Sequence, residues 1–362
     1  MSDRRSAAVQ RGVTVVAGVG PRSATHKAAG APHIARGAVV PRSGSLVAVV
    51  FTTLMVLIPW PAIWLAQNGT PLEDRRVYES QIVNGFLVFD RGVQGDLWSY
   101  VSGEYLWGWL LNLFVRELSL PVAIVFAAIS AFVLFVAAKV ILRHAHPAFL
   151  LFLLNPSFVN LAFSQLRIAL AMALVAAAYL LKGKLPMIWV LRVSLLTAAC
   201  FVHTSMIIFV GLFIASGWIA HGNPERGSYA SLLKLVVAGL AAVVLLGPLR
   251  TWFLSELGDR RVEADYLSSS VSFYLVWLLL AVFLIISWRN IQIVPPVAFA
   301  MACLVVVLAG LFFEVYVNRV IAIALPFFVV ALAALPRAWR PFAIIAYVVF
   351  DVVYWIYWLN IG

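Results

Sequence analysis

Long apolar runs, separated by short polar turns, fill most of this sequence. Each run is close to the ~17–25 residues that a helix needs to cross a bilayer, and none alternates polar and apolar positions as a barrel strand does. The pattern therefore predicts an all-α, polytopic integral membrane protein. The apolar runs lie at 46–66, 120–142, 147–164, 166–182, 186–202, 205–221, 230–248, 271–288, 293–313, 319–335 and 341–358.

A weaker aromatic stretch, residues 99–118, interrupts this pattern and predicts an interfacial or re-entrant helix. Two polar connections, 67–98 and 249–270, are long enough to form loops outside the membrane. With one helix for each strong run, we expect about 11 crossings, within a range of roughly 9–13. Residues 46–362 then form a single membrane domain, with the N-terminus inside and the C-terminus outside.

The charge pattern supports this orientation. The chain is 64% hydrophobic and 11% charged, and its net charge of +11 comes from 26 Lys and Arg against 15 Asp and Glu. Basic residues gather in the arm 1–45 and at alternate ends of the runs, as the positive-inside rule expects of cytoplasmic segments. We interpret the arm as disordered and cytoplasmic, and we expect no nucleic-acid partner. Cys200 and Cys303 lie inside apolar runs and predict neither a disulfide framework nor a metal site.

Three basic residues fall at the opposite, outer ends of their helices: Arg167, His203 and Arg319. A helix from Arg167 to the turn at 182–186, and a second helix back to His203, would bring these two residues to the same depth, because each helix rises about 1.5 Å per residue. Ionisable groups in membrane helices usually face a wet interior and mark a ligand path. Arginine binds phosphate with a planar fork. The alternative to a ligand site is that Arg167 and Arg319 extend to the membrane interface and that His203 makes only a structural hydrogen bond.

The segment 166–214, "LRIALAMALVAAAYLLKGKLPMIWVLRVSLLTAACFVHTSMIIFVGLFI", resembles the EpsG family of polysaccharide polymerases, relatives of the Wzy O-antigen polymerases. An Arg leads an Ala- and Leu-rich helix, a Lys-rich turn follows, and a second helix ends in Phe, His and a small polar pair. The residues that match in order are Arg167, Lys182, Lys184, Phe201, His203, Thr204 and Ser205. Weaker matches are Asp74, Tyr78, Glu104 and Arg319.

The resemblance implies a membrane glycosyltransferase. Such an enzyme joins oligosaccharide repeat units, carried on undecaprenyl pyrophosphate, at the outer face of the bacterial inner membrane, in exopolysaccharide, O-antigen or capsule biosynthesis. It uses no nucleotide sugar, and we expect no cofactor and no metal. Expected partners are the lipid-linked oligosaccharide, the bilayer, a chain-length regulator and a flippase.

In that reaction negative charge grows on the leaving pyrophosphate, and fixed cations stabilise it. Arg167 and Arg319 are the predicted pyrophosphate-binding residues. Either His203 or Glu104 takes the proton of the acceptor hydroxyl. His203 is suited to this role because an imidazole changes charge near neutral pH. Tyr105, Trp107, Tyr316 and Asp74 are the predicted saccharide contacts, although aromatic residues at this position also fit an interfacial belt.

Three other functions are compatible with these residues. A flippase or transporter of lipid-linked saccharides needs the cations but no base. An O-antigen ligase transfers a finished chain and usually carries a larger outer loop late in the sequence. A structural subunit would tolerate alanine at Arg167 and His203.

Overall fold

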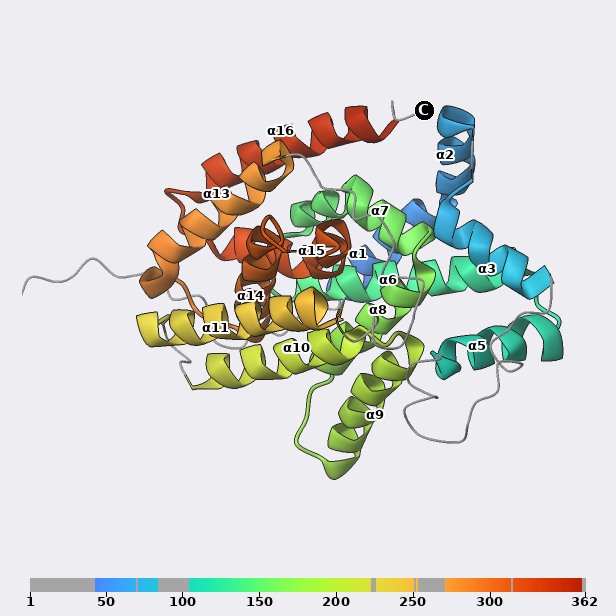
Figure 1. Cartoon of the computed structure of the whole chain (residues 1–362), viewed down its shortest axis with the longest axis horizontal. Coiled ribbons are helices and arrows are strands. Elements are labelled where there is room, and N and C mark those ends of the chain that lie inside the picture. Colours follow the sequence, from blue (N-terminus) through green and yellow to red (C-terminus); the bar gives the residue numbers. More distant parts are fainter. Residues whose placement is uncertain are drawn as a thin grey trace, which may run out of the picture. The chain divides into compact units, whose positions relative to one another are not determined.

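Helices make up every regular element of the described part of the chain. The computed structural model describes residues 43–69, 71–83, 104–222, 226–250, 252, 271–313 and 315–359. Most of the predicted arm, residues 84–103 and most of the 249–270 connection lie outside these ranges. The elements are α1 (Ser43–Leu57), α2 (Trp60–Asn68), α3 (Glu73–Val83), α5 (Tyr105–Leu111), the π-helical turn η2 (Asn112–Glu117), α6 (Val122–Leu142), η3 (Pro147–Leu154), α7 (Pro156–Phe163), α8 (Leu166–Leu180), α9 (Pro186–Val202), α10 (Met206–His221), α11 (Tyr229–Leu246), α13 (Val271–Ser287), η5 (Trp288–Asn290), α14 (Pro295–Ala309), α15 (Val317–Ala334) and α16 (Arg340–Leu359) (Figure 1).

The expected 11 crossings are too many. In the described residues, six helices are long and apolar enough to cross a membrane, or seven if the bent pair α7–α8 counts as one span. Each predicted run is helical, but α9, α10 and α14 have only 15–17 residues. The run 147–164 also divides: η3 ends at Leu154, Asn155 caps α7, and Pro156 occupies the first turn of α7. An abrupt bend of 100° then separates α7 from α8.

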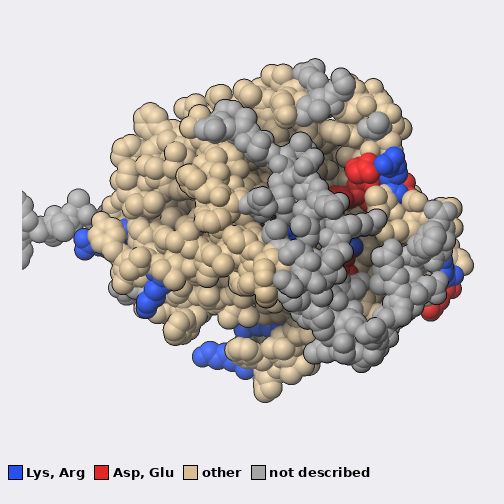
Figure 2. Space-filling view, viewed as in Figure 1, with Lys and Arg blue, Asp and Glu red and all other residues tan. Residues whose placement is uncertain are grey.

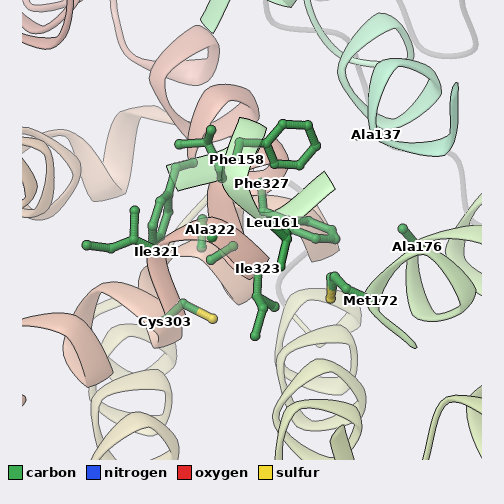
Figure 3. Close-up of a cluster of buried hydrophobic side chains, with 14 of the residues drawn as sticks. Ala137, Phe158, Leu161, Met172, Ala176, Cys303, Ile321, Ala322, Ile323 and Phe327 are labelled. Atoms are coloured by element: carbon green, nitrogen blue, oxygen red, sulfur yellow. The ribbon is translucent and has the colours of Figure 1, made fainter. Parts of the chain in front are cut away.

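The core of the bundle gathers around α15, whose side chains are buried along nearly the whole helix. Side chains from α6, α7, α8 and α14 pack against it, among them Phe158, Met172 and Cys303 (Figure 3). The peripheral helices α1, α11 and α16 expose many large apolar side chains instead. An apolar surface of this extent is what a lipid bilayer covers, so the chain is a helical membrane protein.

Close packing of α11 on α14 depends on Gly239. A Cβ at this position would lie 2.8 Å from the Ala302 carbonyl oxygen and 2.7 Å from Val305 Cβ. Backbone cannot yield as a flexible side chain does, so Gly239→Ala is expected to destabilise the protein by about 1–3 kcal/mol. Gly211 on α10 has open space around the same position and is the matched control. Thermal unfolding in micelles should show a lower midpoint for Gly239→Ala and no decrease for Gly211→Ala; equal midpoints would contradict the packing.

Basic side chains of α6 and the turn after it contact α1 and α8 at one end of the bundle, where α6 and α8 end and α1 begins. Arg143 donates a hydrogen bond to the Tyr179 carbonyl oxygen (3.2 Å) and its guanidinium lies 4.8 Å from the Tyr179 ring. Lys139 donates to Ser45 Oγ (2.9 Å). Figure 2 shows basic side chains alone at the turn after α8, whereas acidic and basic side chains gather together over α3. The turn after α8 is therefore basic, whereas the charges over α3 are mixed.

His144, in the turn after α6, should make this end sensitive to acid. Burial, together with the charges of Arg143 and Lys182, lowers the pKa of His144 to about 4. An unfolded histidine has a pKa of about 6.5 and therefore binds a proton that the folded protein excludes. Stability should fall as pH decreases from about 6.5 towards 4. The midpoint of thermal unfolding should depend less on pH in His144→Gln over this window; an unchanged dependence would contradict the assignment.

Candidate active site

Glu104 lies at the centre of the candidate site, immediately before α5. Its backbone is left-handed (φ 54°, ψ 44°), a conformation that is uncommon for a residue with a side chain. Its carbonyl oxygen accepts a hydrogen bond from Trp107 N (3.0 Å) and so begins the helix. Strained backbone at a single polar residue is often found at functional sites. The turn directs the Glu104 carboxylate towards α8 and α9.

The Glu104 carboxylate joins Arg167 and His203. One carboxylate oxygen forms an ion pair with Arg167 Nη1, and the other contacts His203 Nδ1. The three side chains are largely buried: Glu104 is 14% exposed, His203 15% and Arg167 32%. The structure thus brings together three residues that lie 36 to 99 positions apart in the sequence.

The α8–α9 hairpin explains why Arg167 and His203 meet. Arg167 lies in the first turn of α8, and His203 is the residue that ends α9. The two helices pack side by side, joined by the short connection 181–185 (Figure 1). Because the helices have similar lengths, the start of one and the end of the other lie at the same level, and Glu104 reaches both from α5.

Glu104 is ionised in this environment. Burial by itself would raise the pKa of its carboxyl group. The hydrogen bond with His203 and the charge of Arg167 act in the opposite direction and together hold the pKa below its usual value. An ionised carboxylate accepts hydrogen bonds and cannot donate them. His203 Nδ1 therefore carries a proton and donates it to the Glu104 carboxylate, while Nε2 is the ring nitrogen that faces away from this contact.

Tyr78 of α3 lies against the same cluster. Its side chain is 5% exposed, and its ring lies 5.2 Å from the Trp107 ring and 5.7 Å from the Arg167 guanidinium. Burial raises the pKa of Tyr78 to about 12, although the charges of Arg167 and Arg319 oppose that rise. The phenol is therefore neutral at physiological pH. The charges of both arginines therefore act on the same hydroxyl.

Arg319 and Tyr316 lie together at the beginning of α15. The Arg319 guanidinium lies 4.9 Å from the Tyr316 ring, and the Arg250 guanidinium lies 5.8 Å from the same ring. Sequence reasoning did not single out Arg250, which follows α11 at the start of a polar connection. Its position is the one feature of the sequence that could have identified Arg250, because it follows a helix at the end of the bundle where the helix of Arg319 begins.

The other predicted residues occupy different surroundings. Asp74, in the first turn of α3, is half-buried, and its charge acts on Tyr78. Tyr105 lines a groove between α5 and α9. Trp107 is only 3% exposed, so its ring offers no open face on which a sugar could stack. This is a correction to its predicted role. Tyr316 contacts two guanidinium groups, as above.

Two buried polar atoms beside the cluster have no hydrogen-bond partner in the described part of the chain. They are Trp107 Nε1, a donor, and Gln165 Oε1, an acceptor at the residue that precedes α8. Sequence reasoning did not identify Gln165. A buried polar atom without a partner costs about 1–3 kcal/mol. Five other buried side-chain atoms in the described residues also lack a partner, so these two do not by themselves indicate a ligand.

No protein-family model, curated protein or solved structure matches this chain. The feature of the chain that bears on function is the cluster around Glu104. This cluster has a carboxylate–imidazole pair, which can move a proton, and arginines beside it, which can hold an anion.

Proposed function

We propose that the protein polymerises oligosaccharide repeat units carried on undecaprenyl pyrophosphate, at the outer face of the bacterial inner membrane. The observation that carries the proposal is the double contact of Glu104 with Arg167 and His203. It puts a candidate base beside a candidate anion site. The resemblance of residues 166–214 to the EpsG and Wzy-like polymerases supplies the substrate class.

His203 acts as the general base in this proposal. Its Nε2 takes the proton of the acceptor hydroxyl as that oxygen attacks the anomeric carbon of the donor. The bond from this carbon to the pyrophosphate oxygen breaks, and undecaprenyl pyrophosphate leaves. Glu104 holds Nδ1 and stabilises the imidazolium that forms, as a buried carboxylate does in other catalytic pairs. Glu104 itself is the weaker candidate for the base, because both of its oxygens are engaged and its pKa is lowered.

Arg167 and Arg319 bind the pyrophosphate. Negative charge grows on the leaving group in the transition state, and preorganised cations stabilise that state more than the ground state. A planar guanidinium suits this role because it stays charged and can make two parallel hydrogen bonds to phosphate oxygens. Arg250 lies near enough to Tyr316 to join them when the ligand is bound.

Substitution of either arginine should slow chain extension. Loss of one such donor typically costs about 10²–10³-fold in rate, and we expect this from both Arg167→Ala and Arg319→Ala. Arg319→Lys keeps the charge but loses the planar group over Tyr316, so its rate should lie between those of the wild type and Arg319→Ala. Arg116, exposed on η2, is the matched control, and Arg116→Ala should extend chains normally. The assay is the rate of polymer formation by purified protein. Normal rates in both arginine variants would contradict the pyrophosphate site.

The proposed reaction is tested with purified protein in vesicles that contain the lipid-linked repeat unit and no nucleotide sugar. A ladder of longer lipid-linked products is the expected result. Movement of the repeat unit across the vesicle membrane without a ladder would instead identify a transporter, which needs the cations but has no use for the Glu104–His203 pair.

A further inference from the structure

A second polar cluster lies where η3 gives way to α7, and it involves a carboxyl group of α16. Asn155, the residue between η3 and α7, is fully buried. Its side-chain oxygen accepts a hydrogen bond from Ser157 N (3.0 Å), and its amide nitrogen donates to Asp351 Oδ1 (2.8 Å). The first contact fixes the orientation of the amide, because a backbone N–H can only donate. Asn155 therefore presents a donor to Asp351.

Asp351 lies near the middle of a membrane span. α16 runs from Arg340 to Leu359 and is one of the helices long and apolar enough to cross a bilayer. Asp351 is 11 residues beyond Arg340, which is about 16 Å at 1.5 Å per residue and close to half of the ~30 Å hydrocarbon core. An ionisable side chain at such a depth usually marks a functional site.

No basic side chain of the described residues forms an ion pair with Asp351. The elements that pack on α16 are α2, α7, α13 and α15, and η3 is joined to it by hydrogen bonds. α2, α7 and η3 contain no titratable side chain, and α13 contributes only Tyr274. Arg319 begins α15, and Tyr347 and Tyr354 lie on α16 itself. The carboxyl group thus has no paired positive charge among these elements.

The oxygen atoms around Asp351 are engaged with one another. Three further hydrogen bonds join α16 to η3 and α7: from Tyr347 Oη to the Phe152 carbonyl oxygen (3.2 Å), from Trp355 Nε1 to the Leu154 carbonyl oxygen (2.9 Å) and from Ser157 Oγ to Tyr354 Oη (3.1 Å). A hard metal cation takes about six or more oxygen ligands, and these atoms already have partners. Asp351 Oδ2 has no hydrogen-bond partner in the described part of the chain, and one free carboxylate oxygen is enough to bind a proton.

We propose that Asp351 binds a proton inside the membrane, and that this proton holds α16 against the junction of η3 and α7. Oδ2 takes the proton from water, and the carboxyl group becomes neutral. An ionised carboxylate without a basic partner is costly in apolar surroundings, whereas the neutral group still accepts the hydrogen bond from Asn155. The residues of this site belong to none of α5, α8 and α9, so the proposal is independent of the reaction proposed for the Glu104 cluster.

The experiment is infrared spectroscopy of full-length protein in vesicles, titrated with pH in sodium-free buffer. A protonated carboxyl group has a carbonyl band that an ionised carboxylate lacks. The wild type should show this band at neutral pH, and Asp351→Asn should lose it. Glu117→Gln removes an exposed carboxyl group on η2 and should keep the band. Asn155→Ser keeps an oxygen that can cap α7 but is too short to reach Asp351, so the band should move to higher frequency.

Two spectroscopic results would overturn the proposal. The first is a wild-type spectrum at neutral pH without a band that Asp351→Asn removes, which would mean that the carboxyl group is ionised. The second is loss of the band when sodium is added at constant pH, which would identify a metal ion as the occupant.

Thermal unfolding in micelles tests the link to α16. The folded protein holds a proton that the carboxyl group releases when unfolding exposes it to water, so stability should fall as pH rises. The midpoint of the wild type should decrease over the pH range in which the infrared band disappears. Asp351→Asn is neutral at every pH, and its midpoint should decrease less over that range. Equal decreases in the two proteins would overturn the role of the proton in holding α16.

Discussion

Glu104→Gln should reduce chain extension by about 10³–10⁴-fold, the magnitude typical when a catalytic histidine loses the carboxylate that fixes its tautomer. The amide keeps the shape of the side chain but removes its charge. It also presents an N–H₂ group, which cannot accept the proton that His203 Nδ1 donates. Arg167 loses its ion pair in the same substitution, so the anion site is disturbed together with the base.

The measurement for Glu104→Gln is single-turnover transfer at saturating donor, which separates chemistry from binding. Glu117, exposed on η2 and hydrogen-bonded to Asn112 (3.0 Å), is the matched control because Glu117→Gln removes an acidic charge from the same segment. The control should work at nearly the normal rate. A Glu104→Gln variant that is equally active would show that the contact with His203 and Arg167 is structural.

His203→Gln should slow the same step by about 10²–10⁴-fold, the usual contribution of general base catalysis. The side chain is replaced by a neutral one that can still contact Glu104 but cannot take up a proton. Donor binding should change little, because the proposed pyrophosphate contacts come from Arg167 and Arg319. The expected pattern is therefore a lower rate constant at nearly unchanged half-saturation.

A double variant, Glu104→Gln with His203→Gln, makes this prediction sharper. If the two residues act as one unit, the double variant should be about as slow as the slower single variant, because a pair that acts together is strongly non-additive. Multiplied losses would mean that Glu104 and His203 act independently. That result would reject the assignment of Glu104 as the partner that orients the base.

The fold follows from the sequence at the level of single helices. Every strong apolar run is helical, because a run without polar backbone partners must satisfy its hydrogen bonds internally. The number of membrane crossings could not be predicted correctly from the sequence. Composition gives the apolar length of a run, but the division at Asn155–Pro156 and the abrupt bend between α7 and α8 depend on packing against other helices.

The site was predictable only where local geometry sufficed. Arg167 and His203 share a hairpin, so helix lengths alone place them at the same level. Glu104 precedes Arg167 by 63 positions, and its contact with both residues comes from the packing of α5 on α9. Arg250 and Gln165 were missed for the same reason. Arginine and glutamine near helix ends are common, and only the tertiary contacts distinguish these two.

The most direct test of the account is an electron cryo-microscopy structure of the His203→Gln variant with a lipid-linked repeat unit bound. We expect diphosphate density within hydrogen-bonding distance of Arg167 and Arg319, with the first sugar beside residue 203. Diphosphate density at the opposite end of the bundle, near the lysines of the α8–α9 turn, would contradict it, and so would Arg167 and Arg319 side chains that point into lipid.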